Sequence, residues 1–166
     1  LSLGRAFYTF DVPGGPIRVF VISTAAATGS STGLIRQADI DAIIEPTLQA
    51  AAAADKLVIV TSHHRAGSLN NGLEPGINVG QEFADALTTA EWVDYLGTHD
   101  HVFMHLAAHS HVMHADPMQP VGGHAYWEVA SPALADFPHE LRMLEVWDQD
   151  NGSITIRTVA WLDKLR

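Results

Sequence analysis

The chain has 166 residues, which is typical of one domain and is long enough to bury a sizeable core. Nineteen acidic residues against nine Lys and Arg give a formal net charge of −10, so the basic footprint of a nucleic-acid-binding protein is absent. The absence of cysteine excludes disulfides, thiolate metal sites and thiol nucleophiles, and the longest apolar run, Leu57–Val60, is too short to span a bilayer. We expect neither nucleic acid nor a membrane as a partner.

Hydrophobic patterns predict strands and helices that alternate along the first two thirds of the chain, followed by strands alone. Asp39 is a candidate helix N-cap, Pro46 predicts a kink or a break, and Asn151-Gly152 predicts a hairpin turn. The predicted strands are Ala6–Phe10, Ile17–Ile22, Lys56–Val60, Val102–Leu106, Ala125–Val129, Leu141–Trp147 and Ile154–Trp161, the predicted helices are Gln37–Ala54 and Gln81–Leu96, and Asn70–Gly80 is predicted as a loop.

This order of elements predicts the α/β class, with a mixed β-sheet layered with helices and a β-rich C-terminal section. The first two strands bracket a Pro-Gly turn and are expected to pair as a hairpin. We expect a single domain over residues 1–166. Because the chain starts at Leu1 with no initiator Met, we expect either that an upstream segment was removed or that the chain is part of a longer protein.

Histidines are concentrated between His99 and His114, where six of them and one aspartate fall within sixteen residues. Histidine is the commonest metal ligand in proteins. A solvated or tag-like tract does not fit, because these histidines alternate with apolar residues such as Val102, Phe103 and Leu106. The segment therefore combines interior character with the capacity to bind a metal.

Histidines also follow the ends of two predicted buried strands. His63 comes just after the strand at Lys56–Val60, whereas His109 and His111 come after the strand at Val102–Leu106. In open α/β sheets, ligands bind at the carboxyl ends of strands, where loops from neighbouring strands converge. Because three imidazoles suffice for a catalytic metal site with an open position, we expect His63, His109 and His111 to bind a metal.

The two histidine-bearing segments resemble the calcineurin-like metallophosphoesterases, a family that includes purple acid phosphatases and cyclic-nucleotide phosphodiesterases. The family's H-H-P and G-H-x-H motifs correspond here to His63-His64-Arg65 and Ala108-His109-Ser110-His111. Arg65 replaces the proline and Ala108 replaces the glycine. The resemblance is distributed over most of the chain and includes Tyr8–Asp11, Ile17–Ile22, Gly123–Val129 and Leu141–Val146.

The family's first three motifs, D-x-H, G-D-x-x-D and G-N-H-[DE], do not occur in this chain. The resemblance therefore implies the C-terminal part of a larger metallophosphoesterase domain, with half of its α/β sandwich. Such a half sheet has an unpaired edge and an apolar face, so we expect a homo-oligomer or an association with a missing N-terminal segment.

The resemblance implies hydrolysis of small phosphomonoesters or phosphodiesters by a metal-activated hydroxide. His63 and His109 would bind one metal and His111 another, and the metals would be divalent or trivalent transition metals such as Zn, Mn or Fe. His64 and Arg65 would contact a phosphate oxygen, for which an arginine is well suited. Two alternatives remain open: a non-catalytic or weakly active metal-binding fragment that needs its missing half, and a metal-assisted carboxylesterase.

Other polar residues near these motifs have simpler explanations. His105 lies inside a predicted strand and is expected to be a satisfied core histidine or a partner of a metal ligand. Ser62 and Ser110 adjoin histidines, but no G-x-S-x-G elbow and no orienting aspartate support a serine hydrolase. Structural or surface roles are expected for the remaining histidines, namely His99, His101, His114, His124 and His139.

Overall fold

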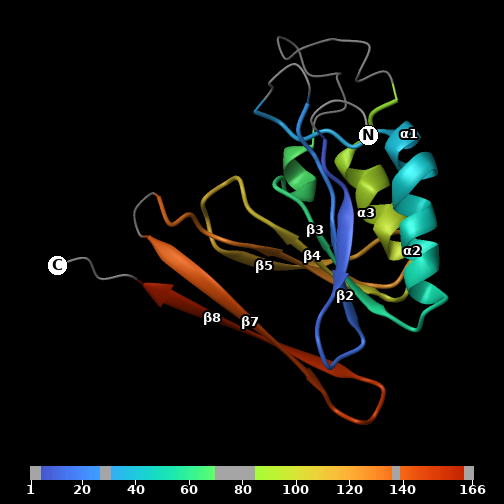
Figure 1. Cartoon of the computed structure of the whole chain (residues 1–166). Coiled ribbons are helices and arrows are strands. Elements are labelled where there is room, and N and C mark those ends of the chain that lie inside the picture. Colours follow the sequence, from blue (N-terminus) through green and yellow to red (C-terminus); the bar gives the residue numbers. More distant parts are fainter. Residues whose placement is uncertain (1–4, 27–30, 70–84, 136–138, 163–166) are drawn as a thin grey trace.

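A computed structural model describes residues 5–26, 31–69, 85–135 and 139–162. A six-stranded sheet of order β1-β2-β3-β4-β6-β5 is covered by helices, and a separate two-stranded ribbon, β7–β8, completes the fold (Figure 1). The strands are β1 (Tyr8–Asp11), β2 (Ile17–Val21), β3 (Leu57–Thr61), β4 (Val102–Ala107), β5 (His114–Met118), β6 (Tyr126–Ala130), β7 (Glu140–Asp148) and β8 (Ile154–Leu162). The helical segments are α1 (Gln37–Asp39), η1 (Ile40–Ile44), α2 (Glu45–Ala52), η2 (Ala66–Ser68) and α3 (Thr89–Gly97).

The sheet is mixed, which confirms the expected α/β class. Strands β2, β3, β4 and β6 run parallel, whereas the edge strands β1 and β5 run antiparallel to β2 and β6. The expected hairpin between the first two strands is therefore confirmed. Strand β5 was not predicted, because its sequence is polar and contains Pro117. Proline is tolerated in an edge strand, where its missing N–H costs no ladder hydrogen bond.

The two faces of the sheet pack against different layers, as strand alternation requires. In β3, Val58 and Val60 belong to the main core beneath the helices, whereas Ile59 between them belongs to a second cluster on the other face. Leu144 and Ile156 of the ribbon pack against that second cluster. The molecule is therefore layered as helices, sheet and ribbon. The helices supply to the main core Ile40, Ile44, Leu48, Ala51, Trp92, Val93 and Leu96.

The first helical region is continuous, but it is not a uniform α-helix. Its N-cap is Arg36, so the expectation that Asp39 caps it is wrong. The buried Asp39 instead forms partly buried ion pairs with Arg5 and Arg36. Burial alone would raise the pKa of the Asp39 carboxyl, but these two guanidinium groups lower it below its usual value. Next to Pro46, which has no N–H for an i→i−4 bond, the backbone takes π-helical geometry over η1.

The second helix, α3, begins later than its apolar pattern predicts. Thr88 is its N-cap and forms a capping box with Glu91, so the described part of the predicted Gln81–Leu96 helix starts at Thr89. Residues 70–84, which include the predicted loop at Asn70–Gly80, lie outside the described residues. No described helix is long and apolar enough to cross a membrane.

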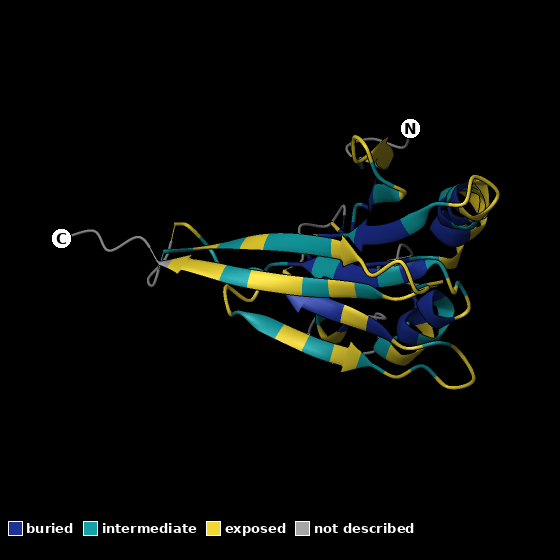
Figure 2. Cartoon of the chain, turned by 90° about the horizontal axis from the view of Figure 1, so that it is seen from below, coloured by how far each residue is buried: buried dark blue, intermediate teal, exposed yellow. Residues whose placement is uncertain are grey.

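The β7–β8 ribbon is much more exposed than the central strands of the sheet (Figure 2). The hairpin expected at Asn151-Gly152 is confirmed, and Gly152 has a positive φ of 81°. One face of the ribbon packs on the sheet, whereas several large apolar side chains along the ribbon are exposed to solvent. These are Leu141, Met143, Trp147 and Trp161.

Candidate metal centre

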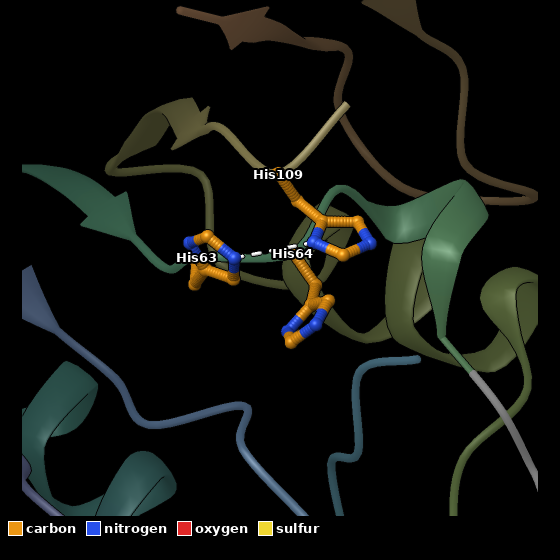
Figure 3. Close-up of side chains that lie close together, drawn as sticks. All are labelled: His63, His64 and His109. Atoms are coloured by element: carbon orange, nitrogen blue, oxygen red, sulfur yellow. Dashed lines mark hydrogen bonds between the residues drawn. The ribbon is translucent and has the colours of Figure 1, made fainter. Parts of the chain in front are cut away.

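Two neighbouring parallel strands bring three histidines to one place. His63 and His64 follow β3, and His109 follows β4 (Figure 3). Because the two strands are parallel, both loops leave the sheet at the carboxyl ends of the strands. Backbone hydrogen bonds join the two loops: the N–H of Ala108 donates to the carbonyl of His63 at 3.0 Å, and the N–H of Ser62 donates to the carbonyl of Leu106 at 3.0 Å. The strand-end geometry expected from the sequence is therefore present.

The three rings lie close enough together to share one metal ion. One ring nitrogen each from His63, His64 and His109 lies within 4.8 Å of the others, and Nδ1 of His109 is 3.1 Å from Nε2 of His63. Ligand nitrogens around a tetrahedral zinc stand about 3.3 Å apart, since each Zn–N bond is about 2.0–2.1 Å long. The closest pair fits this spacing, and the widest pair would have to move closer together to bind the same ion. The all-imidazole donor set suits zinc and other first-row transition metals.

The surroundings of the cluster keep two of its rings neutral. Partial desolvation lowers the pKa of His63, although this residue is exposed, and the neighbouring His109 and His111 lower it further. The pKa of His64 falls to about 4, chiefly because the ring is buried. Electrostatic repulsion from His109 and, to a smaller extent, from His63 adds to this effect. A metal binds neutral imidazole, so protons compete weakly for these two side chains at neutral pH.

His64 is held in place by a threonine that follows β2. Nδ1 of His64 is 2.8 Å from the hydroxyl of Thr24, and the same hydroxyl accepts a 3.3 Å hydrogen bond from the His64 backbone N–H. Both residues are buried. A partner of this kind fixes the ring orientation of metal-bound histidines. No sequence motif singled out Thr24 as a functional residue.

The loop after β4 has an unusual backbone. His109 and His111 have positive φ values of 67° and 55°, which non-glycine residues seldom adopt. Such conformations cost free energy and gather at functional sites. They place His109 within the three-histidine group, whereas His111 is exposed and not part of it, although its charge still lowers the pKa of His63. The structure thus groups His64, not His111, with the expected ligands His63 and His109.

Arg65 faces carboxylates of the neighbouring strands. Its Nε donates to Glu128 at 3.0 Å, and its Nη2 donates to Asp116 at 2.8 Å. Burial raises the pKa of the Glu128 carboxyl, but His105, the N–H of Ala66 and Arg65 together lower it to about 2. The guanidinium is therefore neutralised locally, and its attraction for an anion is reduced unless the Asp116 bond opens. The phosphate contact expected of Arg65 remains a prediction.

His105 is the buried core histidine that the sequence predicts. Its Nε2 is 2.8 Å from the Ser62 hydroxyl, and its Nδ1 is 3.0 Å from Glu128. The connectivity of Ser62, His105 and Glu128 is that of a serine hydrolase triad. However, the Ser62 hydroxyl donates its proton to the carbonyl of His64, and all three side chains are buried. Glu128 was not predicted from the sequence. It could have been noticed as the one carboxylate inside the apolar strand Tyr126–Ala130.

The remaining histidines lie outside the three-histidine group. His99 and His101 lie at the opposite, N-terminal end of β4, where their rings are in edge contact. Nearby, both ring nitrogens of His124 lie within hydrogen-bonding distance of backbone carbonyls, those of Gly97 and Val102. Nδ1 of His139 faces the carbonyl of Leu134. These contacts agree with the structural roles expected for these residues.

Comparisons with known proteins give no family for the chain. No family model matches it, and no curated protein matches it either. Among solved structures, it is similar to the sulfate thiohydrolase SoxB of Thermus thermophilus in complex with glycerol, with 15% sequence identity and a TM-score of 0.47. The match covers 95% of this chain but only 24% of the SoxB chain, so this chain spans about a quarter of that protein's length. A similarity of this size assigns neither a family nor an activity.

Proposed function

We propose that the chain is a metal-dependent hydrolase of phosphomonoesters or phosphodiesters, or the metal-binding part of one. The observation that carries this proposal is the grouping of His63, His64 and His109, whose ligand nitrogens lie within 4.8 Å of one another at the carboxyl edge of the sheet. A transition metal held there would supply a Lewis acid for a phosphoryl oxygen and would lower the pKa of a water molecule.

The chain's own side chains would hold and orient the reacting groups. Thr24 orients the ring of His64, and burial keeps that ring neutral and ready to bind a metal. His111 is exposed one residue beyond the Ser110 turn, where it could bind a second metal or contact substrate. Arg65 could reach a phosphate oxygen after its Nη2 leaves Asp116, the more exposed of its two carboxylate partners. The net charge of −10 means that attraction for an anionic substrate must be local.

The donor set also favours a second candidate, a metal-binding fragment that needs another segment for activity. The three-histidine group contains no carboxylate, although a phosphoesterase with two metals needs bridging or terminal oxygen ligands. The exposed apolar side chains of the ribbon, Trp147 and Trp161 among them, support an association with a further segment or a second copy.

Metal titration of the full chain tests these proposals. After treatment with EDTA, the protein should bind Zn²⁺ or Co²⁺, and His109→Asn should lower that affinity at least 100-fold. His139→Asn is a matched control, because both histidines have a positive φ (67° and 57°) and asparagine tolerates this backbone. Absence of metal binding by the wild type, or equal affinity of the two variants, would overturn the metal site.

Hydrolysis assays then separate the activities. Metal-dependent cleavage of p-nitrophenyl phosphate or bis(p-nitrophenyl) phosphate supports the phosphoesterase, and cleavage of p-nitrophenyl acetate alone supports the carboxylesterase. Metal binding without any hydrolysis supports the fragment.

A further inference from the structure

A row of polar side chains crosses the helix-covered face of the sheet beside the three-histidine group. Ser62 follows β3, His105 lies in β4, and Glu128 lies opposite His105 in β6. Trp92 of α3 covers the row, with its ring edge-on to His105 and the centroids 6.2 Å apart. The three residues are only 8%, 1% and 2% exposed. Burying a polar group costs free energy unless the group has a hydrogen-bond partner. The hydrogen bonds of these three side chains therefore indicate their role.

Glu128 is the centre of the row. Its Oε2 accepts hydrogen bonds from the backbone N–H of Ala66 at 2.8 Å and from Nδ1 of His105 at 3.0 Å, while its Oε1 accepts from Nε of Arg65 at 3.0 Å. Arg65 and Ala66 directly follow His64 in the sequence. One buried carboxylate therefore anchors the segment that leaves the metal ligands.

Ser62 anchors the same segment from its other end. Its hydroxyl donates to the carbonyl of His64 at 2.8 Å and lies 2.8 Å from Nε2 of His105. A carboxylate only accepts hydrogen bonds, so Nδ1 of His105 donates to Glu128. The Ser62 hydroxyl therefore links the His64 carbonyl to the His105–Glu128 pair.

We propose that Glu128 is a positioning residue for the metal centre: through Arg65, Ala66 and the His105–Ser62 pair it clamps both ends of the His63–His64 segment in the geometry that binds metal. This inference rests on the proposed function and deepens it. A partner of this kind outside the ligand set can change metal affinity 10- to 100-fold.

The test compares Glu128→Gln with Glu145→Gln in the full chain. Both residues lie in strands and pair with an arginine, but Glu145 contacts Arg157 on the ribbon and has no part in the three-histidine group. Zn²⁺ affinity is measured by competition with a chromogenic chelator, and the coordination geometry is read from the visible absorption of bound Co²⁺. Glu128→Gln should lower the affinity about 10- to 100-fold and shift the Co²⁺ bands, whereas Glu145→Gln should match the wild type within twofold.

A second variant keeps the proposal testable if Glu128→Gln does not fold. Ser62→Ala removes only a hydroxyl and should weaken Zn²⁺ binding several-fold, with a shift of the Co²⁺ bands in the same direction. If the folded variants give the wild-type Co²⁺ spectrum, the positioning role is overturned, even where the melting temperature falls, and the metal site stands. If the wild type binds no Co²⁺, the proposed function itself fails.

Discussion

Nδ1 of His109 lies 3.1 Å from Nε2 of His63, although 46 positions separate the two residues in the sequence. Without metal, one ring donates an N–H to the lone pair of the other. A metal that binds both nitrogens must replace this hydrogen bond, and the shared proton then moves to the other nitrogen of its ring. Because protons compete with a metal for imidazole nitrogens, metal affinity should rise with pH. The backbone bonds between the two loops keep the pair assembled.

Gly33 offers a way to disturb the site without changing a ligand. An added Cβ at Gly33 would lie 2.6 Å from Cβ and 2.7 Å from Cγ of His64, closer than packed atoms approach. Gly33→Ala should therefore push His64 away from its partners, lower Zn²⁺ affinity at least tenfold and lower the free energy of unfolding by about 1–3 kcal/mol. Isothermal titration and urea unfolding measure the two effects.

Gly67→Ala is the matched control, because a Cβ at Gly67 would meet no atom within 4 Å. Its metal affinity and stability should stay close to those of the wild type. If Gly33→Ala binds Zn²⁺ as tightly as Gly67→Ala does, His64 is not a ligand.

The metal-free protein should lose stability in mild acid because of His64. Its pKa falls from 6.5 in the unfolded chain to about 4 in the folded protein, so between these values the unfolded state binds the extra proton. The contribution to the free energy of unfolding is therefore complete above pH 6.5 and is lost as the pH falls towards 4, with a total of about 3 kcal/mol. Urea unfolding in EDTA from pH 4 to pH 8 measures it. His64→Gln should show a shallower pH dependence than the wild type, and an equal slope would contradict the assignment.

Much of the fold could be predicted from the sequence, since apolar runs such as Ile17–Ile22 and Val102–Leu106 have the composition of buried parallel strands. The errors lie where tertiary contacts outweigh local pattern. Strand β5 contains Pro117, and it forms only because β6 offers it an edge. Asp39 has the chemistry of an N-cap, but the nearby guanidinium groups hold it inside the helix.

The capping box at the start of α3 should contribute measurably to stability. Thr88 accepts a hydrogen bond from the N–H of Glu91, while the Glu91 carboxylate accepts from the N–H of Thr88. Thr88→Ala should lower the free energy of unfolding by about 1 kcal/mol, and Thr88→Ser, which keeps the hydroxyl, by much less. Urea denaturation distinguishes the two, and equal losses would mean that the hydroxyl does not act as a cap.

The layered core predicts a large contrast between two leucines. Leu48 of α2 is fully buried against the sheet, whereas Leu141 of the ribbon is 54% exposed. Leu48→Ala should cost about 2–5 kcal/mol because it leaves a cavity, and Leu141→Ala should change stability by less than about 0.5 kcal/mol. Chemical denaturation with both variants checks the arrangement, and a loss of similar size at Leu141 would show that the ribbon face is covered in solution.

The candidate site was only partly predictable. Strand-end logic located His63 and His109, because it depends on the order of the strands alone. It could not select between His64 and His111, since that selection depends on the positive φ values in the loop after β4 and on the hydroxyl of Thr24. Glu128 was missed because its partners come from β4 and from the loop after β3, far away in the sequence.

The pairing of β3 with β4 also has a consequence for the folding kinetics. Parallel neighbours need a long crossover connection, and here it runs from the end of β3 through α3 to β4. Contacts between residues so far apart in the chain form slowly and late, and His63 meets His109 only once these strands have paired. We expect the rate-limiting state for folding not to contain this site yet, so a metal held by both histidines should slow unfolding and leave the refolding rate unchanged.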